Sequence, residues 1–274
     1  MKRDTMKLNS LIGQFLLASL LSSAAFAQSV EAPQRIKDAG KLVFCSELAY
    51  APWESIDPET QKPVGFDIDI STGVAKEMGV TSEYKDIAFD GLIPALQAGQ
   101  CDAVISSLYD KPERREVVNF VNYAVTGTSI ILRNDSTLPV STLDDLSGQK
   151  VAVQIGTTGE ELLVEASKRL EEAGKAPIDI VILKTTTEAF QQVMAGLVVA
   201  YLATTDQAGF YNKLNPDSIK LAGEPLNTFQ TGIAIRKDDE DLTKAIDAAF
   251  ANMKADGSYQ AILDTWNFQA LALP

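Results

Sequence analysis

Ser106, Ser107 and Arg114 are the residues of this chain whose types and spacing best suit the binding of a small anion. Between Gly65 and Arg115 the pattern predicts two strand-helix units, and the serines lie at the end of the second unit's strand. In open α/β sheets, small molecules bind beyond the carboxyl ends of the strands. Serine hydroxyls donate hydrogen bonds there, and a guanidinium grips a carboxylate through two parallel N–H donors. The pattern therefore indicates a cleft that binds a small carboxylate.

Short apolar runs alternate with amphipathic helical stripes along the rest of the chain, which is typical of an α/β protein with parallel sheets. Ala103-Val104-Ile105 is continuously apolar and is expected to be a central, buried strand. Further strands are expected at 42–44, 128–132, 151–153, 178–183 and 198–202, and helices at 67–78, 90–98, 158–173, 189–194, 242–253 and 259–266.

The first 27 residues have the pattern of a secretory signal peptide rather than of a folded element. A basic start precedes an apolar run, Leu11–Leu21, and Ala25-Phe26-Ala27 matches the small-residue cleavage pattern. An uncleaved membrane anchor is the alternative, but the apolar run is shorter than the roughly 20 residues that a span requires. The residue directly after the cleavage site is not a cysteine, so a lipid anchor there is not expected. We therefore expect a mature protein that begins near Gln28 and resides in the periplasm.

Composition excludes several classes of function. The chain has 24 Lys and Arg residues against 37 Asp and Glu, a net charge of −13 that becomes about −15 without residues 1–27. An acidic surface disfavours nucleic acid and anionic membranes as partners. Histidine is absent, which removes the commonest general base and metal ligand and makes a Ser-His triad impossible. We expect no metal, no cofactor and no nucleic-acid partner.

The two cysteines are expected to remain reduced, although a disulfide is common in an exported protein. Cys45 lies near the end of a predicted strand over 41–46, whereas Cys101 begins a predicted strand over 101–106. If these strands are parallel neighbours, their offset of about four residues separates the cysteines by roughly 13 Å. A disulfide requires Cα atoms within about 7 Å. The predicted strands therefore favour two buried thiols.

A series of short segments occurs in a fixed order and spacing over nearly the whole mature chain. These segments are Tyr50-Ala51-Pro52-Trp53-Glu54, Pro63-Val64-Gly65-Phe66-Asp67, Phe89-Asp90-Gly91-Leu92-Ile93-Pro94-Ala95-Leu96, Asp102-Ala103-Val104-Ile105-Ser106-Ser107, Pro112-Glu113-Arg114, Gly156-Thr157-Thr158-Gly159 and Ala255-Asp256-Gly257-Ser258-Tyr259. In them the chain resembles the periplasmic solute-binding proteins of ABC importers, in the branch that binds polar amino acids (family 3 extracellular solute-binding proteins).

The resemblance implies a two-lobed periplasmic-binding-protein fold of type II, with two parallel-rich sheets flanked by helices and joined by two crossover strands. By analogy, the first lobe covers 28–125 and 230–274, and the second covers 126–229. The implied function is that of a monomeric, non-catalytic receptor. It would capture an amino acid or an amino-acid-like small acid by hinge closure and deliver it to the membrane permease of an ABC transporter.

Two residues of this chain match the positions that hold the ligand's α-carboxylate in the family. Arg114 matches the arginine that holds this carboxylate, and Thr158 matches a residue whose backbone N–H helps to hold it. The alternative for Arg114 is a surface ion pair with Glu113 or Glu116, which Arg115 could equally make. Thr158 lies where a loop enters a helix, so it suits an anion and also an ordinary helix cap, and the two roles are compatible.

Aromatic and polar positions complete the implied site. Tyr50 and Phe89 match residues that sandwich the ligand side chain, with burial in the core as the alternative, whereas Trp53 and Phe66 are expected to be core. Glu47 matches a position that reaches the ligand's polar end, and Ser107 matches one that contacts the ligand backbone. The alternatives are a solvated carboxylate at Glu47 and a strand-end hydrogen bond at Ser107.

Three positions depart from the family pattern. Tyr109 stands where relatives place a small hydroxyl residue, and its ring would narrow the pocket. The aspartate that holds the ligand's α-ammonium in relatives aligns closest to Thr204, with Asp206 two places on. Either the loop brings Asp206 into the site, or the ligand lacks an ordinary α-ammonium. Gln154, at a position that lines the specificity pocket, is neutral, and a strand-edge role is its alternative.

Two other functions compete with that of a transport receptor. A few relatives are extracytoplasmic dehydratases, and such an enzyme needs an acid or base with a shifted pKa inside the cleft. Glu47 and Asp206 are the only acidic candidates, and no histidine can assist them. The other alternative is a ligand-presenting component of a membrane sensor.

Overall fold

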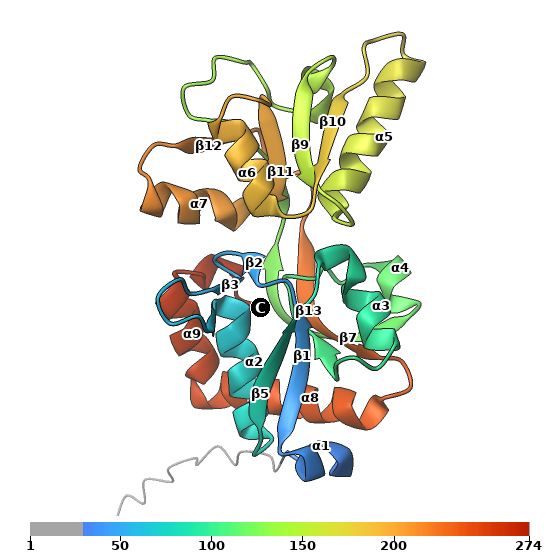
Figure 1. Ribbon diagram of the computed structural model, residues 1–274, viewed down its shortest axis with the longest axis vertical. Helices are drawn as coiled ribbons and strands as arrows, with labels where there is room; N and C mark the ends of the chain where they lie inside the picture. Colours follow the sequence, from blue (N-terminus) through green and yellow to red (C-terminus); the bar gives the residue numbers. More distant parts are fainter. Residues whose placement is uncertain (1–29, 274) are drawn as a thin grey trace, which may run out of the picture.

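Two lobes, each built around its own β-sheet, make up the part of the chain that the structure describes (Figure 1). The structure is a computed structural model, and it describes residues 30–273. The expected signal peptide and its cleavage site lie outside the described residues. The two-lobed α/β architecture, with helices flanking both sheets, confirms the fold class expected from the sequence. Within residues 30–273, no helix combines the length and the apolar character needed to cross a membrane.

The first lobe contains a five-stranded sheet in the order β5-β1-β6-β13-β7. β5, β1 and β6 are parallel, whereas β13 runs antiparallel to both of its neighbours. Ser106 and Ser107 follow the carboxyl end of the central parallel strand β6, as the sequence predicts. The strands are β1 (Lys41–Ser46), β5 (Thr81–Asp86), β6 (Ala103–Val104), β7 (Val118–Thr126) and β13 (Phe229–Arg236).

The second lobe repeats this plan in a five-stranded sheet of order β10-β9-β11-β8-β12. β10, β9 and β11 are parallel, and β8 runs antiparallel to β11 and to β12. The parallel part of each sheet is thus extended by antiparallel strands, and both sheets are mixed. The strands are β8 (Thr128–Arg133), β9 (Lys150–Gln154), β10 (Asp179–Leu183), β11 (Ala200–Thr204) and β12 (Ile219–Ala222).

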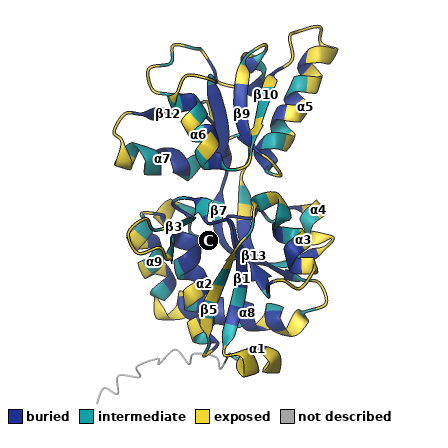
Figure 2. Ribbon diagram, in the orientation of Figure 1, coloured by how far each residue is buried: buried dark blue, intermediate teal, exposed yellow. Residues whose placement is uncertain are grey.

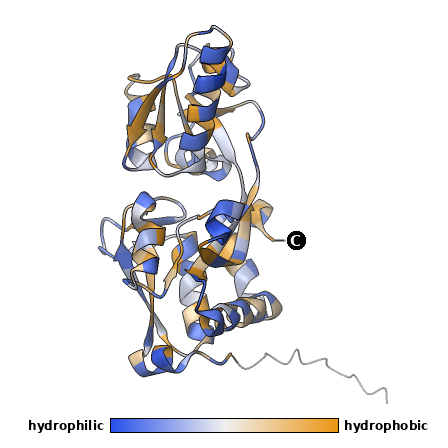
Figure 3. Cartoon of the chain, turned by 90° about the vertical axis from the view of Figure 1, so that its right-hand side faces the viewer, coloured by the Kyte–Doolittle hydropathy of each residue, from blue (hydrophilic) through white to orange (hydrophobic). Residues whose placement is uncertain are grey.

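Helices cover both faces of each sheet, so the strands are mostly buried and hydrophobic (Figures 2 and 3). Because successive side chains of a strand point to opposite faces, Val151 and Val153 pack with α5, whereas Ala152 packs with α6. The helices are α1 (Gln34–Ala39), α2 (Phe66–Glu77), α3 (Leu92–Gln97), α4 (Pro112–Arg115), α5 (Thr158–Glu172), α6 (Thr186–Met194), α7 (Thr205–Leu214), α8 (Glu240–Asp256) and α9 (Ser258–Trp266), with short 3-10 turns η1 (Phe89–Gly91), η2 (Leu143–Leu146) and η3 (Gln269–Leu271).

A small sheet stands at the end of the first lobe that faces the second lobe (Figure 1). It consists of β2 (Ala49–Tyr50), β3 (Glu54–Ile56) and β4 (Pro63–Val64), all antiparallel. The side chain of Thr187 on α6 donates a hydrogen bond to the carbonyl of Ala49, 2.8 Å away. The small sheet is therefore part of the contact between the lobes.

Two chain segments cross between the lobes side by side. β7 ends at Thr126 and continues through Gly127 into β8, while β13 begins at Phe229, which is paired with Thr126. A Cβ atom on Gly127 would lie 2.2 Å from the carbonyl oxygen of Asn227 on the other segment. No side chain fits at that distance, so glycine is what lets the two backbones approach here.

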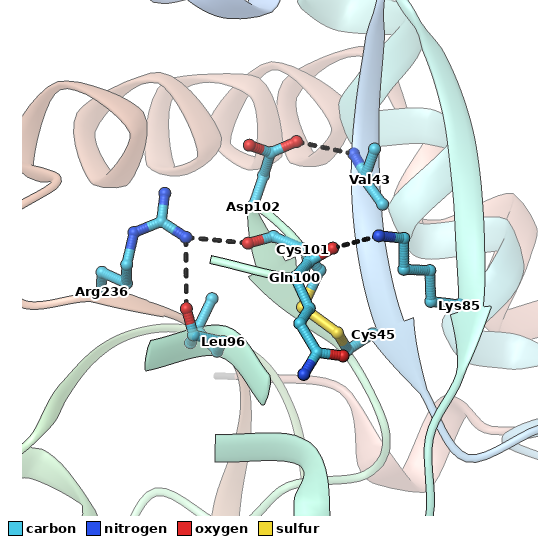
Figure 4. Close-up of a disulfide and its surroundings, with 8 residues drawn as sticks. All are labelled: Val43, Cys45, Lys85, Leu96, Gln100, Cys101, Asp102 and Arg236. Atoms are coloured by element: carbon cyan, nitrogen blue, oxygen red, sulfur yellow. Dashed lines mark hydrogen bonds between the residues drawn. A yellow bond between two sulfur atoms is a disulfide. The ribbon is translucent and has the colours of Figure 1, made fainter. Parts of the chain in front are cut away.

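A disulfide joins Cys45 and Cys101, so the expectation of two reduced thiols is wrong (Figure 4). The expected strand began at Cys101, but β6 begins at Ala103 and the chain bends at Asp102. This bend turns Cys101 onto the face of the sheet where Cys45 lies, and the two Cα atoms are 5.7 Å apart. Asp102 holds the bend by pairing with Val43, through N–H to O of 2.8 Å and through Oδ2 to N–H of 3.0 Å.

Replacing both cysteines by alanine is expected to lower the free energy of unfolding by about 4 kcal/mol, because the disulfide constrains the unfolded chain between residues 56 apart. Urea unfolding of the oxidised mature protein and of C45A/C101A measures the difference. Wild-type protein unfolded in reductant serves as the control and should match the variant. Two free thiols in denatured, unreduced wild-type protein would contradict the disulfide.

Candidate functional site

A cavity lies between the lobes, beyond the carboxyl ends of the parallel strands. The first lobe contributes residues from β2, η1 and the loop after β6, and the second lobe contributes the ends of β9 and β11 and the starts of α5 and α6. The cavity is lined by Tyr50, Phe89, Ser107, Tyr109, Arg114, Thr128, Gln154, Thr157, Thr158, Gly159, Thr186, Leu202, Ala203 and Thr204.

Arg114 enters the cavity from the short helix α4 without a carboxylate partner among the described residues. Its guanidinium donates to the carbonyl of Tyr109 at 3.0 Å and to that of Gly156 in the second lobe at 3.5 Å. Glu113 pairs instead with Lys111, so the surface ion pair considered as an alternative does not form. Burial lowers the pKa of Arg114, but a guanidinium stays charged at neutral pH. A partly buried guanidinium without an ion-pair partner among the described residues is suited to receive an anion.

Ser107 is held in a left-handed backbone conformation, with φ of +45°, by a buried acidic group. Its N–H donates to Asp67 at 2.7 Å, and Asp67 also accepts from the hydroxyl of Tyr123 at 2.7 Å. Ser106 donates to the neighbouring buried carboxyl of Glu54 at 2.5 Å. Burial raises the pKa of Asp67 to about 7.

Neither Asp67 nor Glu54 was expected from the sequence to support the site. Asp67 has the pattern of an ordinary acidic residue in the first turn of a helix. The signal that could have found Asp67 is its position beside the apolar Phe66 and Ile68, both of which are buried.

Thr158 is the first residue of α5, where the sequence places it. The cap is provided by the preceding residue, Thr157, whose hydroxyl accepts from the N–H of Glu160 at 3.3 Å. The hydroxyl of Thr158 is buried in the cavity lining and has no hydrogen-bond partner in the described structure. The start of a 15-residue helix with a free hydroxyl is a favourable place for an anion.

Three aromatic rings, Tyr50, Phe89 and Tyr109, line the cavity. The hydroxyl of Tyr50 reaches across to the second lobe, where it donates to Oγ1 of Thr204 at 2.8 Å and accepts its N–H at 3.1 Å. Tyr109 packs against Phe229, with ring centroids 5.3 Å apart. The expectation that Trp53 and Phe66 belong to the core is confirmed, since both are fully buried.

Asp206 does not line the cavity. It lies in the first turn of α7 and accepts from Nε1 of Trp53 at 2.7 Å, from Oγ1 of Thr126 at 2.7 Å and from Oγ1 of Thr204 at 3.2 Å. Burial raises its pKa. Asp206 is therefore an acceptor for donors of the protein itself, and it joins the second lobe to Trp53 of the first.

Glu47 lies behind Gln154 as seen from the cavity. Nε2 of Gln154 donates to both carboxyl oxygens of Glu47, at 2.8 and 2.7 Å, and Oε1 of Gln154 accepts from Thr186 at 2.7 Å. Glu47 is buried rather than solvated, and burial raises its pKa to about 7. Of the two residues, Gln154 is the one that borders the cavity.

Side chains of the two lobes are in direct contact around the cavity. Besides the pairs already described, Lys111 of the first lobe forms an ion pair with Glu161 of the second. A Cβ atom on Gly156, whose φ is +75°, would lie 3.0 Å from Cβ of Asp90 in the facing lobe. The described conformation is therefore one in which the lobes are closed on each other.

Comparisons with known proteins agree with this architecture. The model of the bacterial extracellular solute-binding proteins, family 3, matches residues 42–270. The chain is 29% identical over 233 residues to the L-cystine-binding protein TcyJ of Escherichia coli K12, covering 85% of this chain and 84% of that protein. It is 32% identical over 274 residues to the L-arginine-binding protein of Pseudomonas aeruginosa, covering 95% of this chain and 96% of that protein.

A solved structure adds a further similarity. It is described as the ancestral amino acid-binding protein AncCDT-1, a precursor of cyclohexadienyl dehydratase, and it shares 31% sequence identity with this chain. The TM-score is 0.76, and the match covers 85% of this chain and 97% of that chain.

The buried carboxyl of Glu47 should make stability depend on pH. Its pKa is about 7 in the folded protein against 4.5 for the free group, so folding favours its protonated form. This contribution is fully present below pH 4.5 and is lost as pH rises through about 7, by about 3 kcal/mol in all. Urea unfolding at pH 5 and pH 8 should show a smaller difference for Glu47→Gln than for the wild type. The exposed Glu224→Gln is the matched control, and a wild-type slope retained in Glu47→Gln would disprove the assignment.

Proposed function

Since this chain belongs to the bacterial extracellular solute-binding proteins, family 3, we propose that it captures an amino acid or an amino-acid-like small acid between its lobes. It then delivers this ligand to the membrane permease of an ABC transporter. The protein acts in the periplasm, after removal of the signal peptide expected over residues 1–27. It works as a monomer.

The observation that carries the proposal is the charge of the cavity. Arg114 is the single charged side chain among the lining residues that the structure describes, and it forms no ion pair with a carboxylate of the described residues. The hydroxyls of Ser107 and Thr158 stand free in the same lining. A guanidinium, two hydroxyls and a helix N-terminus together form a donor set for a carboxylate.

Closure of the lobes completes the site. The donors Ser107 and Arg114 belong to the proposed first lobe, 28–125 with 230–274, whereas Thr158 belongs to the proposed second lobe, 126–229. The two adjacent crossover segments at Gly127 and Asn227 provide the hinge. Closing buries the ligand's charge, and the donors placed in advance compensate for the water that is lost.

Binding rather than catalysis is favoured by the placement of the acidic groups. A dehydratase requires an acid or a base at the substrate, but Glu47 and Asp206 are engaged with donors of the protein and do not line the cavity. The ancestral precursor of a dehydratase is itself described as an amino acid-binding protein. Mass spectrometry of a bound compound after prolonged incubation tests this point, and conversion of the compound would favour the enzyme. Pull-down of a sensor rather than a permease from membranes would favour the sensor alternative.

Arg114→Ala is expected to abolish ligand binding, because it removes the only cation among the described lining residues. Thermal shift over the proteinogenic amino acids, opines and small organic acids identifies a ligand, which should raise the wild-type melting temperature by about 5 °C at saturation. The adjacent Arg115→Ala is the matched control, since Arg115 is exposed and paired with Asp110. It should keep the shift. A shift retained in Arg114→Ala would remove Arg114 from the site, and a screen without any hit would count against the function.

Gly156→Ala is expected to weaken binding of the same ligand at least tenfold by obstructing closure. Gly174→Ala is the matched control, because its φ of +71° is close to the +75° of Gly156 but nothing lies within 4 Å of the added Cβ. Both variants bear the same backbone strain, so isothermal titration isolates the contact with Asp90. Equal affinities of the two variants would show that this contact does not limit closure.

A further inference from the structure

The positive end of an amino acid needs acceptors, and the described lining of the cavity offers it no carboxylate. A primary ammonium carries three N–H donors, and burying it without acceptors costs several kcal/mol. Its usual partner is a carboxylate. Among the lining residues that the structure describes, none is an aspartate or a glutamate.

One acid close to the lining, Asp206, contacts it through Thr204. The hydroxyl of Thr204 donates to Asp206 and accepts from Tyr50, so the three side chains form a chain of two hydrogen bonds. Trp53 and Thr126 complete the set of donors to Asp206. An ammonium would have to compete with these contacts, which also join the lobes.

The second acid, Glu47, is covered in a similar way. Gln154 stands between it and the cavity, with its amide nitrogen on Glu47 and its amide oxygen accepting from Thr186. Both ends of this amide are therefore in use. Glu47 cannot reach a ligand without a rearrangement of Gln154.

Two hydroxyl groups of lining residues have no partner and can donate hydrogen bonds to an anion. Ser107 and Thr158 are 5% and 7% exposed, and their hydroxyls have no partner in the described structure. Both lie in the lining with Arg114. The rest of the surface includes the rings of Tyr50 and Phe89, which suit an apolar body or the methyl groups of a quaternary nitrogen.

Resting on the function proposed above, we propose that the ligand is a carboxylate whose α-carbon bears no N–H donor. The carboxylate binds Arg114, Ser107 and the start of α5, and the aromatic walls hold the remainder. Two sources share this chemistry: acids without an α-nitrogen, and acids whose α-nitrogen is fully alkylated. The two carboxyl groups behind the lining that could hold a primary ammonium, Glu47 and Asp206, already accept hydrogen bonds from donors of the protein.

The test compares compounds that differ only at the α-position, by isothermal titration with the mature protein. Three series are used: L-phenylalanine, hydrocinnamate and trimethyl-L-phenylalanine; L-leucine, isocaproate and trimethyl-L-leucine; L-arginine, guanidinovalerate and trimethyl-L-arginine. In at least one series, the acid without an N–H donor should bind at least tenfold tighter than the amino acid. Preference for the unsubstituted or the trimethylated acid identifies which source applies.

Equal or tighter binding of the amino acid in every series that binds overturns this inference but leaves the proposed function intact. Absence of binding in all three series overturns both. Asp206→Asn is the companion variant, because an amide oxygen can still accept at this position. Its affinity for the preferred acid should stay within about threefold of the wild type, with the fold checked by circular dichroism. A selective loss of amino-acid binding in this variant would show that Asp206 reads an ammonium. If the variant does not fold, the wild-type preference alone decides.

Discussion

A guanidinium that is placed in a cavity without a carboxylate partner is the constraint on which the rest of this site depends. Arg114 is oriented by the carbonyls of Tyr109 and Gly156, which are neutral, and it forms no ion pair among the described residues. The acidic neighbours on its own helix turn and loop are taken up elsewhere, Glu113 by Lys111 and Asp110 by Arg115. In a chain with a net charge of −13, this cation is thus kept available by the pairing of the residues around it.

The acidic groups near the cavity have a structural role that follows from the two-lobed fold. Glu47 and Asp206 each accept hydrogen bonds across the gap between the lobes, from Gln154 and from Trp53. Buried carboxyl groups are stable only where donors surround them, so each acid needs the facing lobe to be present. The closure of the lobes and the lack of a carboxylate in the described cavity lining therefore have one physical cause. The acids that hold the lobes together are not available to a ligand.

A similar buried acid supports the anion-binding loop from below. Asp67 accepts the N–H of Ser107, whose backbone is in a left-handed conformation that non-glycine residues rarely adopt. Such strain persists only where the surroundings enforce it, and here the hydrogen bond and the burial of Ser107 do so. The position of Ser107 in the lining thus depends on a carboxyl, Asp67, that is not itself part of the lining.

How much could be predicted from the sequence differs between kinds of feature. Alternating apolar runs and helical stripes predict the order of strands and helices, since periodicity reflects burial directly. Short-range motifs also predict that Ser107, Arg114 and Thr158 lie at strand ends and helix starts, although their contact with a ligand stays a prediction. The pairing of Cys45 with Cys101 was beyond this reasoning, because it depends on a bend at Asp102 that no periodicity records.

By itself, the sequence determined the α/β class, the strand-end position of the serines and arginine, and the absence of histidine from any mechanism. Only the tertiary structure decided that neither Glu47 nor Asp206 lines the cavity. Asp206 is two residues from Thr204 in the chain, yet Thr204 lines the cavity and Asp206 binds Trp53, which lies 153 residues away in the other lobe. The direction of a side chain at a lobe interface depends on the donors that the facing lobe presents. That information is distributed over distant segments and is not contained in any local pattern.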